Sequence, residues 1–214
     1  MSEENMNYEM EENLGDNSEE QEDSFSGTTG FENTVYDWAR CLVSAVVGVV
    51  LLFVFAFRLI GVSGGSMQDT LYTGDRLLIL NSALCNFEQG DIVIINAYNA
   101  QLNDTIIKRI IAVGGQTIDI DFITGTVFVD GKALEENYVR EPTFTTGGIQ
   151  FPLTLAPDEV FVMGDNRNAS TDSRSTMLGP VKKDYIQGEA FFLLIPGKSA
   201  DTDKMDWSRI GFVR

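Results

Sequence analysis

The sequence contains no histidine in its 214 residues. This absence excludes the Ser-His-Asp and Cys-His arrangements of many hydrolases, and it excludes zinc sites built on an HExxH helix. Only two cysteines are present, Cys41 and Cys85, which are too few for a zinc ribbon or a disulfide framework. We expect no disulfide between them, because Cys41 lies inside a long apolar run. Any hydrolase built on this chain therefore needs a base other than histidine.

Cations are also scarce: the chain has 15 Lys and Arg against 32 Asp and Glu, which gives a formal net charge of −17. We see no basic stripe and predict no nucleic-acid partner. The imbalance is greatest in residues 1–37, which hold twelve acidic residues and no Lys or Arg. This segment is poor in apolar residues, so we predict a disordered acidic tail, solvated rather than bound to a partner.

One long apolar run follows the tail. Residues 41–57 carry no charge and would span about 26 Å as a helix. Arg40 and Arg58 flank the run, and Trp38 stands where an interfacial anchor is expected. We predict one transmembrane helix over residues 38–60. A core helix is disfavoured because nothing else in the chain is apolar enough to surround it, and the long acidic leader does not suit a cleaved export signal. The flanking cations do not decide the orientation.

Residues 61–214 are predicted to form one domain that is mainly β. Short apolar or alternating runs are separated by Gly, Asp and Asn turn signals, and no long helical periodicity competes with them. This spacing favours an antiparallel sandwich or a partly closed barrel. The predicted strands cover residues 76–80, 91–96, 105–113, 117–120, 126–129, 159–163 and 189–195.

Two segments of this domain carry candidate reactive groups. Ser66 follows a glycine pair a few residues beyond the apolar run; paired glycines allow a tight, exposed bend, although the same sequence suits a linker. In the strand predicted over residues 105–113, Lys108 and Arg109 stand between isoleucines. Strand alternation puts them on opposite faces, and one of them could extend to water. Burial is compatible with a lysine that loses its proton but not with an arginine, so Lys108 is the candidate base and Arg109→Lys should be nearly silent.

A third segment, residues 164–174, is dense in Asp, Asn, Arg and Ser. It lacks the bidentate Glu that ends an EF-hand loop, so we predict no metal site there. Its charges and amides instead indicate a hydrogen-bonded turn that holds another element in place.

In this order behind an apolar helix, the three segments closely resemble the sequence boxes of type I signal peptidases. Ser66-Met67-x-x-Thr70-Leu71 resembles the nucleophile box, Lys108-Arg109-Ile110 and the following glycine pair resemble the lysine box, and residues 164–174 resemble the third box. The resemblance spans about residues 58–195. The large inserted β domain of some members is absent, as in the compact single-span type.

The resemblance implies twisted antiparallel sheets and a serine protease without a cofactor, in which Ser66 is the nucleophile and Lys108 the general base. Burial must then lower the pKa of Lys108 toward neutrality. Ser170 would hydrogen-bond and orient the Lys108 amine, and Asp172 and Arg174 would form a structural ion pair. The tail would be cytoplasmic and the catalytic domain would lie outside the membrane.

The implied reaction removes signal peptides from exported preproteins after small residues in an A-x-A pattern. An extended peptide would add to a sheet edge, with Met67 and Ile107 as candidate pocket walls. One rival is a self-cleaving regulator with the same chemistry, which the transmembrane helix and the lack of a DNA-binding segment disfavour. The other rival is an inactive, membrane-tethered β domain that binds extended peptides without cutting them.

The sequence departs from the family pattern at three places. Asp69 stands where the nucleophile box usually has proline, and it also suits a turn. Residues 112–116 read Ala-Val-Gly-Gly-Gln in place of Gly-x-Pro-Gly-Asp. Gly64 replaces a residue whose hydroxyl serves the oxyanion hole in some members, so we expect the hole to use the backbone amides of Ser66 and Gly64.

Overall fold

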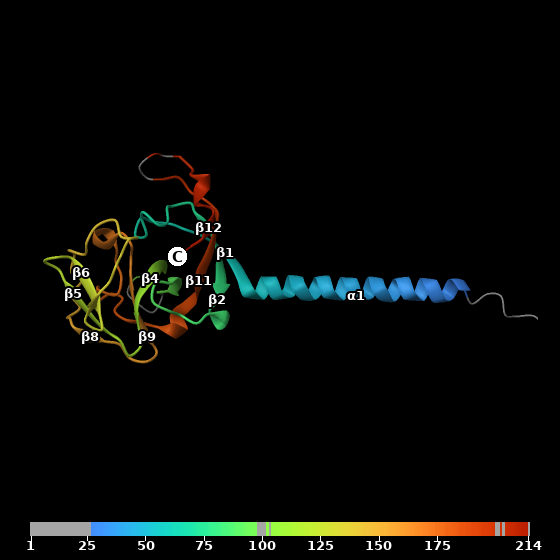
Figure 1. Ribbon diagram of the computed structural model, residues 1–214, viewed down its shortest axis with the longest axis horizontal. Helices are drawn as coiled ribbons and strands as arrows, with labels where there is room; N and C mark the ends of the chain where they lie inside the picture. The colour runs from blue at the N-terminus through green and yellow to red at the C-terminus, as the bar shows by residue number, and fades with distance from the viewer. Residues whose placement is uncertain (1–26, 98–101, 103, 200–201, 203, 214) are drawn as a thin grey trace, which may run out of the picture. The chain divides into compact units, whose positions relative to one another are not determined.

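The computed structural model describes residues 27–97, 102, 104–199, 202 and 204–213. The chain divides into two compact units, Met1–Val49 and Val50–Arg214. Helix α1 (Gly27–Ala56) belongs mostly to the first, and all the strands belong to the second, which we call the β unit (Figure 1). Most of the predicted acidic tail lies outside the described residues.

Helix α1 contains most of the predicted membrane segment, residues 38–56 of 38–60. Its 23 residues Thr34–Ala56 are long and apolar enough to cross a membrane. The helix begins at Gly27, before the predicted start at residue 38, in a stretch that holds no helix-breaking proline. It ends at Ala56 rather than at residue 60. The next residues form strand β1 (Phe57–Gly61), because their backbone groups pair with β2 instead of continuing the helical ladder.

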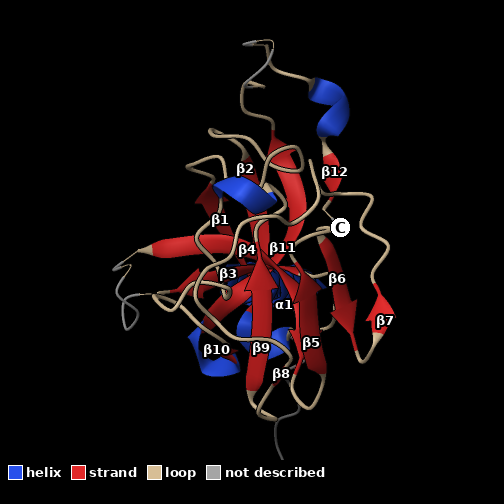
Figure 2. Cartoon of the chain, turned by 90° about the vertical axis from the view of Figure 1, so that its left-hand side faces the viewer, coloured by secondary structure: helices blue, strands red, loops and turns tan. Residues whose placement is uncertain are grey.

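The β unit contains two antiparallel sheets, which confirms the predicted mainly β fold (Figure 2). The larger sheet has eight strands in the order β1-β2-β11-β3-β4-β9-β10, with β12 paired to β11. After β1, its strands are β2 (Arg76–Asn81), β3 (Ile92–Asn96), β4 (Thr105–Val113), β9 (Glu159–Met163), β10 (Val181–Lys182), β11 (Ile186–Ile195) and β12 (Gly211–Phe212). The smaller sheet has the order β7-β6-β5-β8 and contains β5 (Thr117–Asp121), β6 (Thr126–Val129), β7 (Lys132–Ala133) and β8 (Leu153–Thr154).

Irregular pairing bends the larger sheet. The register shifts twice where β11 pairs with β2, between Ala190 and Phe192 and again between Leu193 and Ile195. Further shifts interrupt the pairing of β11 with β3, between Ile186 and Gly188, and of β4 with β9, between Ile110 and Ala112. Such bulges increase local twist. Along the described strands the sheet starts at β1 and ends at β10 without closing into a ring.

Three apolar clusters fill the interior. One lies between the two sheets and takes residues from β4, β5, β6 and β9, such as Ile111, Ile118 and Phe161. A second includes Val93, Ile110, Val162 and their neighbours. The third joins β2, β3 and β11 to Met67 and Leu71, two buried residues that follow Ser66. The segment that carries Ser66 is therefore anchored in the core.

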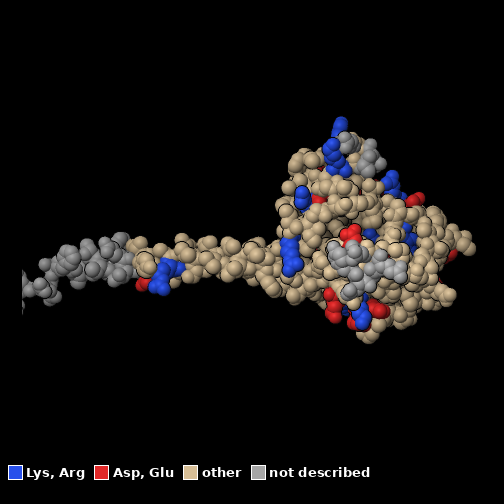
Figure 3. Space-filling view, turned by 180° about the vertical axis from the view of Figure 1, so that it is seen from behind, with Lys and Arg blue, Asp and Glu red and all other residues tan. Residues whose placement is uncertain are grey.

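Charged side chains are dispersed on the visible face of the β unit. In Figure 3, Lys and Arg lie singly or beside Asp and Glu, outside the area covered by grey atoms. No broad basic patch gathers on the part of this face that the structure describes. The absence of a nucleic-acid partner stays a prediction.

Candidate active site

Ser66 lies at the start of a tight turn between β1 and β2. Gly64 precedes it with a φ of 96°, a conformation that favours glycine. The turn closes with a hydrogen bond from the Leu71 amide to the Met67 carbonyl at 2.8 Å. Burial of the Met67 and Leu71 side chains fixes the turn, while Ser66 stays at the border of a pocket.

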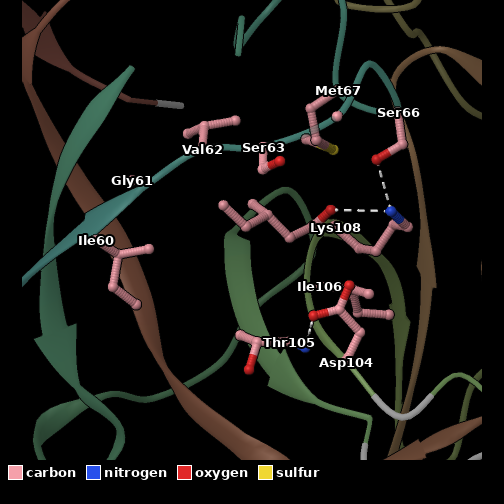
Figure 4. Close-up of a pocket in the computed structure, with 12 residues that line it drawn as sticks. Ile60, Gly61, Val62, Ser63, Ser66, Met67, Asp104, Thr105, Ile106 and Lys108 are labelled. Atoms are coloured by element: carbon pink, nitrogen blue, oxygen red, sulfur yellow. Dashed lines mark hydrogen bonds between the residues drawn. The ribbon is translucent and has the colours of Figure 1, made fainter. Parts of the chain in front are cut away.

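Lys108 lies in the middle of β4, opposite Val93 of β3, and its side chain is only 3% exposed. Its Nζ is hydrogen-bonded to Ser66 Oγ at 2.7 Å and to the Ile107 carbonyl oxygen at 3.1 Å. Figure 4 shows the two side chains pointing toward one another across the pocket. A hydroxyl and an amine from segments far apart in the sequence are thus brought into contact.

Burial is the main reason that the pKa of Lys108 falls from 10.5 to about 8. The negative charges of Asp172 and Asp165 act in the opposite direction and raise this pKa, and Arg174 lowers it. Desolvation outweighs the carboxylates, because the ammonium loses its hydration inside the protein. An amine with this pKa is neutral in about one molecule in ten at pH 7, compared with fewer than about one in a thousand for an unperturbed lysine.

Asp172 and Arg174 form the predicted ion pair in the turn behind Lys108. Arg174 Nε donates to Asp172 Oδ1 and Nη2 to Oδ2, both at 2.8 Å, and both side chains are nearly fully buried. Asp172 also accepts the Gly164 amide at 3.1 Å, while Arg174 reaches the carbonyl oxygens of Arg167 and Thr145. The pair therefore ties together the loop that follows β9.

Ser170 ends the short 3-10 helix η2 (Arg167–Ala169), close to the nucleophile segment. A Cβ at Gly164 would overlap both Ser170 Oγ and the Ser66 carbonyl oxygen, so these groups pack around this glycine. The predicted hydrogen bond from Ser170 to the Lys108 amine is absent from the structure. Lys108 bonds to Ser66 and Ile107 instead, and the buried Ser170 Oγ has no hydrogen-bond partner among the described residues.

Gly64 also differs from its expected role. Its amide donates to Thr73 Oγ1 at 3.2 Å, and the Thr73 hydroxyl in turn donates to the Gly64 carbonyl. This reciprocal pair stabilises the turn and uses the amide that was expected to face an oxyanion. The Ser66 amide makes no hydrogen bond within the described part of the chain, so it remains available as a donor.

A pocket of about 380 Å³ opens beside Ser66 and Lys108 (Figure 4). Its walls are the end of β1 with the segment that follows it, and the beginning of β4. Both candidate wall residues, Met67 and Ile107, line it. The other lining residues include Ile60, Gly61, Val62, Ser63, Asp104, Thr105 and Ile106.

Several side chains that support the site were missed in the sequence. Arg109 is 2% exposed and forms a bidentate ion pair with the fully buried Asp165. Asp165 also accepts a hydrogen bond from the Thr70 hydroxyl, and the backbone amide of Asn166 donates to the Ser66 carbonyl at 3.0 Å. A cation among buried isoleucines is itself a signal that a carboxylate partner is required. Nothing in the local sequence around Asp165, Thr70 or Asn166 indicates which distant residue each of them contacts.

The turn at residues 112–116, whose sequence departs from the family pattern, is closed by local hydrogen bonds. Gly115 has a φ of 87°, the Gln116 amide donates to the Val113 carbonyl, and Gln116 Oε1 accepts the Val113 amide. Asp69 lies in the Ser66 turn, with Arg140 at 3.8 Å. Local hydrogen bonds thus close the turn at Gln116, while Asp69 has an exposed cationic neighbour. Within the described residues, no group of three or more Cys, Asp or Glu side chains is arranged to hold a metal ion.

Comparison with known proteins gives matches over most of the chain. The model of the signal peptidase family, peptidase S26, matches residues 35–195. The chain is 33% identical over 178 residues to a signal peptidase I of Bacillus licheniformis, covering 79% of this chain and 93% of the relative. It is 33% identical over 171 residues to a probable signal peptidase I-2 of Synechocystis sp., covering 77% of this chain and 75% of the relative. A crystal structure of a signal peptidase I from Enterococcus faecalis matches 49% of this chain and 97% of its own at 25% identity, with a TM-score of 0.41.

Proposed function

Because the chain belongs to the signal peptidase family S26, we propose that it cleaves signal peptides from exported preproteins with Ser66 as nucleophile and Lys108 as general base. The observation that carries this proposal is the 2.7 Å hydrogen bond between Ser66 Oγ and a buried Lys108 Nζ whose pKa is about 8. Without burial, a lysine would be almost wholly protonated at neutral pH and could not act as a base.

The reaction follows from these two groups. Neutral Lys108 takes the proton from Ser66 Oγ as the oxygen attacks the scissile carbonyl carbon. The Ser66 amide donates to the developing oxyanion. The lysine ammonium then protonates the leaving amine as the peptide C–N bond breaks, which releases the mature protein. Lys108 next deprotonates a water molecule, which hydrolyses the ester at Ser66 and frees the signal peptide.

The supporting residues act through the loop behind the base. In this proposal Asp172 and Arg174 hold the loop by their ion pair, and Asp172 also tunes the pKa of Lys108. Ser170 packs against Gly164, which is also in close contact with the Ser66 carbonyl oxygen. Gly64 shapes the turn through its positive φ rather than donating to the oxyanion.

An extended signal peptide fits the pocket between the β1 end and β4. β1 is an edge strand of the larger sheet, so its free side can pair with an extended backbone. Met67 and Ile107 line the pocket, and in this proposal they face the small side chains of the A-x-A pattern.

We propose that α1 anchors the chain in the membrane, with residues 1–37 cytoplasmic and the β unit extracytoplasmic. The reasons are that the described residues contain one helix long and apolar enough to cross a membrane, and that the chain belongs to a signal peptidase family. Protease added to intact spheroplasts should then degrade the β unit and spare the tail. Degradation of the tail alone would contradict this orientation and show that the tail faces outward.

The decisive experiment incubates purified full-length protein in detergent with a preprotein. Wild type should release the signal peptide, whereas Ser66→Ala should not, although it should still bind the preprotein. Binding without cleavage by both proteins would instead support the peptide-binding domain. Cleavage confined to the enzyme's own chain would support the self-cleaving regulator.

A further inference from the structure

Asp75 and Arg209 form an ion pair at the far end of the nucleophile turn. Asp75 is fully buried just before β2, and Arg209 belongs to the 3-10 helix η4 (Trp207–Arg209), near the C-terminus. Arg209 Nη1 donates to Asp75 Oδ1 at 3.0 Å and Nη2 donates to Oδ2 at 2.7 Å. The carboxylate also accepts the amides of Tyr72 and Gly197, at 2.9 and 2.5 Å. Four donors therefore surround this buried carboxylate.

Arg209 also contacts the turn directly. Its Nη2 donates to the Thr70 carbonyl at 3.0 Å, and its guanidinium lies over the Tyr72 ring, 4.4 Å from the centroid. The Thr70 hydroxyl donates to Asp165 Oδ2 at 2.5 Å. Thr70 is thus held on its carbonyl side by Arg209 and on its hydroxyl side by the loop after β9.

The front of the same turn is held by Asn166. Its amide donates to the Ser66 carbonyl and its Nδ2 to the Gly65 carbonyl, both at 3.0 Å. The nucleophile turn is therefore fixed at both ends by segments distant in sequence. The rear contact comes from residues beyond 195, where the family match ends. Pairing of β12 with β11 anchors this C-terminal segment on the larger sheet (Figure 1).

We infer that Arg209 is a positioning residue that keeps Ser66 Oγ in line with Lys108 Nζ by holding the rear of the turn. The inference rests on the proposed function. Arg209 does not touch either reacting atom in the structure, so it acts through Thr70 and Asp75. Proton transfer and attack demand close geometry, and a displacement of about 1 Å can cost on the order of 10²-fold in rate.

The test compares Arg209→Gln and Arg209→Lys with Lys182→Gln, which removes an exposed cation on β10. Each full-length variant is assayed on a preprotein in detergent, below its own melting temperature. We expect Arg209→Gln to lower kcat on the order of 10- to 100-fold with KM within about twofold of wild type. Arg209→Lys keeps the charge but not the fork of donors, so its loss should be intermediate. Lys182→Gln should match wild type.

Hydrogen exchange supplies a second measurement that does not depend on catalysis. The Leu71 and Tyr72 amides should exchange faster in Arg209→Gln, because their acceptors lie in the released turn, while the β9 amides keep their protection. Unchanged kcat, a change in KM alone, or unchanged exchange at the turn would overturn the positioning role. So would a loss of protection throughout the β unit, since Arg209 would then serve stability alone. An inactive wild type that binds preprotein would overturn the proposed function, and the exchange comparison would still decide whether Arg209 holds the turn.

Discussion

Arg109 and Asp165 face each other in the interior of the β unit as a bidentate ion pair. Arg109 Nε lies 2.9 Å from Asp165 Oδ1 and Nη2 lies 2.7 Å from Oδ2, with side chains 2% and 0% exposed. The same guanidinium donates to the Gly90 carbonyl and lies 4.0 Å from the centroid of the Tyr138 ring. A planar fork of donors meets all these contacts at once, whereas an ammonium cannot. The structure therefore argues against the expectation that Arg109→Lys is nearly silent.

Arg109→Lys should destabilise the fold by about 1–3 kcal/mol, because buried acceptors lose their donors although the charge is kept. Thermal unfolding of the purified full-length protein would show this loss as a lower melting temperature of the β unit. Arg140→Lys is the matched control, since Arg140 is 42% exposed and lies 3.8 Å from its acidic neighbour Asp69. Equal melting temperatures for the two variants would contradict the prediction.

Asp172→Asn should lower stability and also move the pH profile of the enzyme. Removing one partner of the buried pair leaves Arg174 uncompensated, at a cost of up to about 3–5 kcal/mol. Asp172 raises the pKa of Lys108, so its neutralisation should shift the acid limb of kcat/KM to lower pH. The measurements are thermal unfolding and cleavage across pH, corrected for the folded fraction. The control is Asp158→Asn, because Asp158 is 62% exposed. Full stability with no turnover at any pH would make Asp172 a catalytic participant.

The acidic tail should be dispensable for catalysis. Its sequence has no apolar pattern that could dock on the β unit, and in the proposed topology the membrane separates the two. A chain that starts at Asn33 should therefore cleave a preprotein in detergent at the wild-type rate. A loss of about tenfold, which corresponds to about 1.4 kcal/mol of activation free energy, would contradict this prediction.

The regular strands could be predicted because their side-chain pattern is local. The predicted segment 105–113 coincides with β4, and 159–163 coincides with β9. β1 was missed because Phe57–Gly61 continues the apolar composition of the membrane helix, and only pairing with β2 makes it a strand. The two-residue strands β7, β8, β10 and β12 are too short to show any periodicity.

The candidate site was predictable in its reacting groups but not in its supports. Lys108 stands out because a cation inside an apolar strand is unusual, and the resemblance connects it to Ser66. The acceptor of the Gly64 amide depends on how the chain returns at Thr73, which no local pattern encodes. The Asp75–Arg209 contact joins residues 134 positions apart, so it emerges only when the sheet is assembled.

Cleavage should become faster as pH rises toward about 8, the pKa of Lys108. Only the neutral amine can accept the Ser66 proton, so kcat/KM should increase about tenfold per pH unit below this value and level off above it. The pKa of Lys108 in the folded protein lies below its value of about 10.4 in the unfolded chain. Between these two values the unfolded chain binds more protons than the folded protein. The contribution of Lys108 to the free energy of unfolding therefore also rises with pH in this range. A rate profile that is flat from pH 6 to about 9 would rule out a lysine base of this pKa.

Lys108→Arg should fold and bind preprotein yet lose most of its turnover. A guanidinium keeps the positive charge but does not deprotonate in proteins, so it cannot accept the Ser66 proton. Lys108→His supplies a base of suitable pKa on a shorter side chain that should not span the distance to Ser66 Oγ. Both variants should lose on the order of 10²–10⁴-fold or more in kcat, measured with preprotein at saturating concentration. Lys182→Arg, the same change at an exposed site on β10, should leave kcat unaltered. Near-normal cleavage by Lys108→Arg would show that this buried cation serves the structure and that another group activates Ser66.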